Sequence, residues 1–216
     1  MRMLRTFLYA VIFALAATLP AQAKTLSIVI DQSVSNPLVL DKAYAKMVAR
    51  YAQAQISTLQ LGDWLHIRHF GDRSAAHFLS EKIRITRGMR ADKAAAMVAG
   101  FIASLPSKQL QGQRQTNIIA VLEFGQFDCD KKSRVLLLTD GIESSALMNE
   151  RDLLSGNKPL PPPDEKFLSG CEVTMMGVGQ SIDGSLTPQA VKHLRAAWTA
   201  WMKQAGASPF TVIIDP

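Results

Sequence analysis

The sequence predicts an α/β fold in which a doubly wound, mostly parallel six-stranded sheet carries helices on both faces. Segments that have the pattern of strands alternate with segments that have the pattern of helices along nearly the whole chain. The clearest strands, near residues 25–30, 133–141 and 171–179, are apolar runs rather than alternating ones. Such runs are typical of strands that are buried on both faces, as in parallel sheets.

The first residues have the pattern of a secretory signal. MRMLR is basic, residues 7–19 form an unbroken apolar run, and PAQA supplies small residues before a cleavage point after Ala23. The run is shorter than the about 20 residues that a membrane-spanning helix needs. We expect residues 1–23 to be removed and residues 24–216 to form a single domain, periplasmic or secreted, with no stable membrane span. An uncleaved signal that anchors the chain is the alternative.

The remaining chain is mildly basic and has two cysteines. The net charge of +6 falls to (24 − 2) − 18 = +4 when Arg2 and Arg5 are removed with the signal. No long cluster of Lys and Arg is present, so a nucleic-acid partner is not expected. In an exported chain Cys129 and Cys171 are expected to pair, if the fold brings them together.

The first half of the domain contains three strands and two helices. Tyr44, Met47, Val48 and Tyr51 recur at helical spacing within a helix expected over residues 38–59. GDWLHIRHFG, residues 62–71, alternates between glycines and predicts a second strand. EKIRITR, residues 81–87, predicts a short, charged edge strand. An alanine-rich helix follows over residues 92–105.

The second half continues the alternation. A short helix is expected within TNIIAVLEF, residues 116–124, with Thr116 as its cap. A proline-rich connection (KPLPPPDEK) separates the strand at 133–141 from the strand at 171–179. A long helix then begins at the cap Thr187 and ends at Gly206, with Trp198 and Trp201 on its core face. PFTVIID closes as the last strand.

Oxygen-bearing side chains follow two of the buried strands. Asp31, Ser33 and Ser35 come at alternate positions as the first strand ends, and Asp140 ends the strand VLLLTD. Parallel sheets bind ligands beyond the carboxyl ends of their strands. Carboxylate and hydroxyl oxygens suit Mg²⁺, which is small, hard and octahedral. The competing interpretation is structural: the serines cap the next helix, and Asp140 begins a turn.

Together with Thr116, these residues resemble the metal ion-dependent adhesion site of the von Willebrand factor type A (vWA) family. The resemblance extends from Thr25 to Asp215. It implies strand order 3-2-1-4-5-6, with strand 3 as an antiparallel edge. It also implies a Mg²⁺ ion, or Mn²⁺ as a substitute, at a site whose five residues are Asp31, Ser33, Ser35, Thr116 and Asp140. A partner protein's Asp or Glu completes the metal shell in that family.

The resemblance carries further expectations and some departures. The strand order makes the strand after Cys129 a neighbour of the strand that Cys171 opens, so a structural disulfide is expected away from the metal. Val34 and Gln115 stand where many relatives have glycine. In the family's adhesion receptors a helix after the last strand moves on ligand binding, and this change is not carried over. Asn36 and Glu143 are candidates for contacting a partner.

Enzymatic function is not expected. The sequence has no phosphate loop, no nucleophile elbow and no second aspartate where Ser33 stands. The four histidines, at positions 66, 69, 77 and 193, have no metal-ligating spacing. The predicted function is an exported adhesion or assembly module that captures a partner carboxylate through Mg²⁺. The alternatives are a metal-free scaffold subunit of a cell-envelope complex and, less favoured, a Mg²⁺-dependent hydrolase.

Overall fold

A computed structural model describes residues 23–70, 80–107, 115–129 and 133–215. The predicted signal peptide and His77 lie outside the described residues. Within the described ranges, no helix is both long and apolar enough to cross a membrane.

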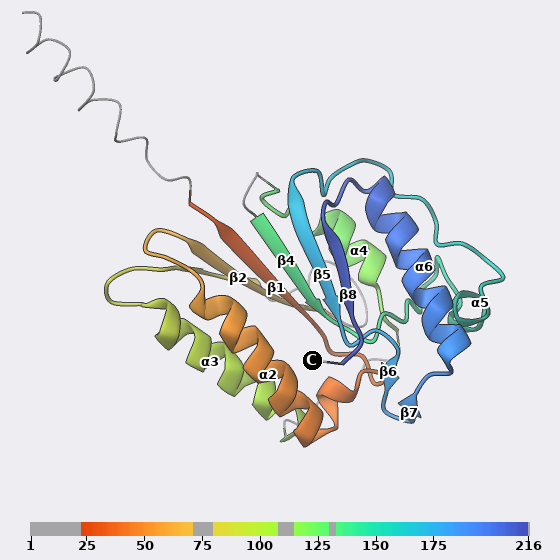
Figure 1. The fold of residues 1–216 in the computed structure, drawn as a ribbon, viewed down its shortest axis with the longest axis horizontal. Coiled ribbons are helices and arrows are strands. Elements are labelled where there is room, and N and C mark those ends of the chain that lie inside the picture. The colour runs from red at the N-terminus through yellow and green to blue at the C-terminus, as the bar shows by residue number, and fades with distance from the viewer. Residues whose placement is uncertain (1–22, 71–79, 108–114, 130–132, 216) are drawn as a thin grey trace, which may run out of the picture.

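The sheet confirms the predicted fold class (Figure 1). Its six strands run in the order β3-β2-β1-β4-β5-β8, and only β3 is antiparallel to its neighbour. The strands are β1 (Thr25–Asp31), β2 (Trp64–Phe70), β3 (Ser80–Arg84), β4 (Ser133–Leu138), β5 (Cys171–Met176) and β8 (Phe210–Ile213). This order is the one that the vWA resemblance implies, with β8 as the sixth strand.

Helices cover both faces of the sheet (Figure 1). One face carries α2 (Lys42–Ser57) and α3 (Ala91–Ser104), and the other carries α4 (Ile118–Phe124), α5 (Glu150–Ser155) and α6 (Pro188–Gln204). Each layer of helices buries its own apolar core against the sheet. Trp198 and Trp201 of α6 are buried in the second core, as predicted.

Local hydrogen bonds set where the helices begin. α2 begins later than expected because Asp41 caps it, accepting from the backbone N–H groups of Ala43 and Tyr44. Before it, Pro37–Val39 forms a separate 3-10 turn, η1. Thr187 caps α6, as predicted, and Pro188 follows at the first position of the helix.

Three features differ from the expectations. Thr116 does not cap α4: the cap position is Asn117, and Thr116 pairs through its backbone with Ser144. The short helix α5 was not expected, nor was a small hairpin of β6 (Gln180–Ser181) and β7 (Gly184–Ser185). A second short 3-10 turn, η3 (Leu105–Ser107), ends the α3 segment.

The disulfide between Cys129 and Cys171 is present, as expected, with its Cα atoms 4.7 Å apart. Cys171 opens β5 and lies beside Ser133, the first residue of β4. The bridge therefore lies at the amino ends of these strands. Asp31 and Asp140 follow the carboxyl ends of β1 and β4, at the opposite edge of the sheet.

Candidate metal-binding site

Asp31 is the most firmly held member of the predicted site. Its side chain is fully buried at the end of β1. One carboxylate oxygen, Oδ1, accepts from the Ser33 backbone N–H at 2.8 Å, and Oδ2 accepts from the Thr139 hydroxyl at 2.7 Å. Thr139 follows β4 directly, so the pairing of β1 with β4 fixes this carboxylate from two strands.

The two serines bring their hydroxyls together beyond Asp31. Ser33 Oγ and Ser35 Oγ lie 3.2 Å apart, and Ser33 is buried while Ser35 is half-buried. The Ser35 carbonyl accepts from the backbone N–H of Ile182, in the hairpin between β6 and β7, at 3.0 Å. The loop that carries Ser33 and Ser35 is therefore held both by the hairpin and by Asp31.

Asp140 is fully buried after β4 and retains an unused oxygen. Its Oδ1 accepts from the Ile142 N–H at 2.9 Å, whereas its Oδ2 has no hydrogen-bond partner among the described residues. Gly141 follows with φ of +77°, a backbone conformation that residues other than glycine rarely adopt. The Trp198 indole N–H donates to the Gly141 carbonyl at 2.8 Å, and this bond fixes the turn from the core side.

Thr116 is joined through its backbone to the loop that follows Asp140. The backbone N–H of Thr116 donates to the Ser144 carbonyl at 2.9 Å, and the Ser144 N–H donates to the Thr116 carbonyl at 3.0 Å. Next to this pair, Glu143 Oε2 accepts from the N–H groups of Ile118 and Ile119 at 2.7 and 3.1 Å. This backbone pairing connects Thr116 to the chain segment that carries Asp140.

The electrostatics of the site favour a cation. Burial raises the pKa of Asp31 to about 6, although hydrogen bonds from Thr139 and Ser33 oppose the rise. Burial, followed by the charge of Asp31, raises the pKa of Asp140 well above its ordinary value. Burial raises the pKa of Glu143 to about 7. A positive ion bound beside these acids would offset the cost of burying their negative charge.

The donor set fits Mg²⁺ in its chemistry. Asp140 Oδ2 is a buried acceptor without a hydrogen-bond partner among the described residues, as is Glu143 Oε1. Asp31, the paired hydroxyls and Asp140 are hard oxygen donors at one edge of the sheet. Within the described ranges, no group of three or more His, Cys, Asp or Glu side chains could hold a metal ion. A site here must therefore depend on hydroxyls as well as on two carboxylates.

Asn36 and Glu143 do not offer surfaces to a partner. Their exposed fractions are 1% and 0%. The Asn36 amide donates to the carbonyls of Asp31 and Leu138 at 3.1 and 3.3 Å, which joins the ends of β1 and β4, and Glu143 holds the start of α4. Their roles are structural, which corrects the expected partner contacts. Thr139 is the residue that sequence reasoning missed. Its position directly before Asp140, on a strand beside Asp31, was the available signal.

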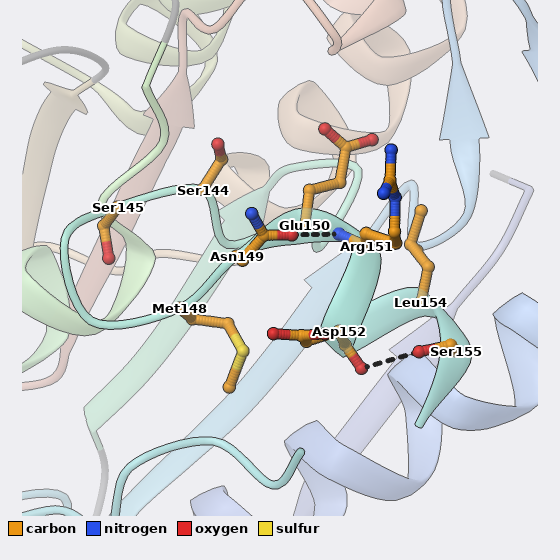
Figure 2. Close-up of a pocket in the computed structure, with 9 residues that line it drawn as sticks. All are labelled: Ser144, Ser145, Met148, Asn149, Glu150, Arg151, Asp152, Leu154 and Ser155. Atoms are coloured by element: carbon orange, nitrogen blue, oxygen red, sulfur yellow. Dashed lines mark hydrogen bonds between the residues drawn. The ribbon is translucent and has the colours of Figure 1, made fainter. Parts of the chain in front are cut away.

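A polar cavity adjoins the site on the side of α5 (Figure 2). It has a volume of about 960 Å³ and begins at Ser144, the backbone partner of Thr116. Asn149, one of the residues labelled in Figure 2, accepts from the Arg151 N–H at 2.8 Å and so caps α5. The lining of the cavity consists of Ser144, Ser145, Met148, Asn149, Glu150, Arg151, Asp152, Leu154 and Ser155.

Comparisons with known proteins show similarity in fold alone. No protein-family model and no curated protein matches this chain. Among solved structures, the pilus adhesin SpaC from Lactobacillus rhamnosus GG is similar with a TM-score of 0.50 and 14% identity, over 91% of this chain and 29% of the SpaC chain. An aerotolerance-related membrane protein from Bacteroides fragilis gives 0.47 and 14%, over 89% of this chain and 92% of that one.

A von Willebrand factor type A structure from Catenulispora acidiphila is also similar, with a TM-score of 0.42 and 18% identity over 89% of this chain and 38% of that one. The present chain thus spans less than half of the SpaC and Catenulispora chains. The vWA-like fold itself rests on the observed strand order and the antiparallel edge strand.

Proposed function

We propose that this chain is an exported protein-binding module that captures a carboxylate of a partner protein through Mg²⁺. The ion would be held by the two acids and three hydroxyls described above: Asp31, Ser33, Ser35, Thr116 and Asp140. The observation that carries the proposal is Asp140 Oδ2, a fully buried carboxylate oxygen without a hydrogen-bond partner among the described residues. It lies in a site with a second buried acid and two converging hydroxyls.

The proposed site combines two charged carboxylates with three neutral hydroxyls, a set that leaves room for a ligand from another protein. When bound, Mg²⁺ supplies a positive charge with coordination positions that water or an external oxygen can fill. In the resembled family the two acids act largely through coordinated waters, so the direct protein ligands are neutral hydroxyls and the ion stays electrophilic. An Asp or Glu side chain of a partner is the external ligand that such an ion favours. Mn²⁺ has the same preference for oxygen donors and should substitute.

The residues around the proposed site favour a binding role over catalysis. His66, a residue with the chemistry of a general base, is buried in β2 and hydrogen-bonded to Ser80 at 2.6 Å, on a strand that does not supply the five site residues. The Asp31 carboxylate accepts from the Thr139 hydroxyl, a group that does not have the chemistry of a general base. Export is supported by the signal-like residues 1–23 and by the disulfide.

The test is calorimetric titration of Mg²⁺ and Mn²⁺ into purified residues 24–216. We expect binding at one site, lost in Asp31→Ala and retained in Asp92→Asn, which removes an exposed acid of α3. Identical heats in the wild type and Asp31→Ala, or none at high metal concentration, would instead favour the metal-free scaffold. Turnover of phosphoesters that Asp31→Ala abolishes would favour the hydrolase.

A further inference from the structure

We propose that the face around the candidate metal site selects partner segments in which the metal-binding Asp or Glu has an apolar neighbour. The apolar contact is formed by Val34 and Ile182. This inference rests on the proposed function and names the class of partner that the same site takes.

Val34 is the first part of this surface. It lies between Ser33 and Ser35, whose hydroxyls converge 3.2 Å apart. Ser33 is buried, whereas Val34 has an exposed fraction of 39%. An apolar side chain therefore faces solvent in the middle of the loop that would hold the ion.

Ile182 is the second part, and it comes from a different element. It lies at the tip of the hairpin of β6 and β7, where its exposed fraction is also 39%. Its backbone N–H donates to the Ser35 carbonyl at 3.0 Å, so the tip is attached to the same loop that carries Val34. The base of the hairpin is held by backbone bonds from Gln180 to Gly177 and from Leu186 to Gly179. The hairpin is thus held beside Ser35 by backbone hydrogen bonds at its tip and at its base.

The other side of the site has the opposite chemistry. Beyond Thr116, its backbone partner Ser144 opens the polar cavity of Figure 2, which Ser145 and Asn149 also line. A bound segment with its carboxylate at the ion would meet apolar side chains towards the hairpin and polar ones towards α5. The partner class is therefore a protein segment with one acid, an apolar residue on one side of it and a polar residue on the other.

The expected preference is modest and measurable. A tenfold gain in affinity, about 1.4 kcal/mol, requires roughly 55 Å² of apolar surface removed from water at about 25 cal/mol per Å². That is a fraction of one leucine side chain, which two partly exposed residues can cover. A larger effect is not expected from a surface of this size.

The experiment uses three blocked peptides, Ser-Asp-Ser, Leu-Asp-Ser and Ser-Asp-Leu, titrated into residues 24–216 in excess Mg²⁺ and followed by NMR. We expect one of the leucine peptides to bind about tenfold more tightly than Ser-Asp-Ser. The preference should disappear in Val34→Ser/Ile182→Ser. The matched control is Leu61→Ser, which removes an apolar side chain of 67% exposure before β2, at the opposite edge of the sheet.

The outcomes separate this inference from the proposed function. Mg²⁺ affinity, measured by calorimetry, should be the same in the wild type and both variants, because no metal-binding side chain is changed. Equal affinities for all three peptides, no peptide binding by the Mg²⁺-loaded protein, or a preference that survives in Val34→Ser/Ile182→Ser would overturn the inference while the metal site stands. Absence of Mg²⁺ binding in the wild type would overturn both.

Discussion

Replacing Asp31 with asparagine should stabilise the metal-free protein, by an amount that grows with pH. The side chain is fully buried and its pKa is raised from an ordinary 3.8 to about 6. At about 1.4 kcal/mol per pKa unit, this rise corresponds to about 3 kcal/mol of unfolding free energy. Asparagine keeps an oxygen for the Ser33 N–H and carries no charge to bury.

The direction of this pH dependence follows from whether the folded or the unfolded chain holds the Asp31 proton more tightly. The folded protein keeps the Asp31 proton up to about pH 6, whereas the unfolded chain loses it near 3.8. The contribution to stability is therefore fully present below pH 3.8 and is lost as the pH rises through 6. The charge of Asp31 also raises the pKa of Asp140, so its removal relieves Asp140 in the same direction.

The assay is thermal unfolding of the wild type and Asp31→Asn at pH 4 and pH 8 with a chelator present. Between these pH values, the stability advantage of Asp31→Asn should grow by about 3 kcal/mol, or about 6–12 °C in Tm for a domain of this length. Added Mg²⁺ should raise the Tm of the wild type at pH 8 and leave the variant unchanged. A difference between the two proteins that does not change with pH would refute the reasoning.

Three further predictions concern the scaffold. Replacing Cys129 and Cys171 together with alanine should cost about 4 kcal/mol in urea unfolding, because the bridge closes a loop of 42 residues; unchanged stability would contradict a structural bridge. Trp198→Phe should cost about 1–3 kcal/mol in the same assay, because it leaves the buried Gly141 carbonyl without its donor; a loss below about 0.5 kcal/mol would mean that this bond is dispensable. Burial and then the charge of Arg68 lower the pKa of His66 to about 4, so the contribution of His66 to stability should fall as the pH drops from 6.5 to 4. His66→Gln should remove that part of the acid sensitivity, and parallel acid titrations of the two proteins would argue against it.

The sheet and the two acids could be predicted because the information is local. β1 and β4 are largely apolar runs; β1 ends on Asp31, and Asp140 comes two residues after β4. Their adjacency did not follow from local pattern and came only from the resemblance, which supplied the strand order. The disulfide depended on the same order, because Cys129 lies beyond α4 and Cys171 opens β5.

The remaining features of the site depend on contacts between distant segments. A glutamate after a strand is expected on the surface, yet Glu143 is buried because it accepts from N–H groups of α4, about 25 residues earlier. The hairpin has two residues in each strand, too few for an alternating pattern. Its place beside Ser35 comes from one backbone bond of Ile182. No local sequence signal predicts either contact.

The central place of β1 has a mechanical consequence. β1 pairs with β2 along seven residues and with β4 along five, and it runs from Thr25 at one edge of the domain to Asp31 at the other. A force applied between residue 24 and a partner held at the site would act along the axis of this strand. Both hydrogen-bonded ladders would then be loaded in shear, with all their bonds resisting together. Pulling in this direction opposes both ladders of β1 at once, so a partner bound through the proposed ion should detach before the sheet yields.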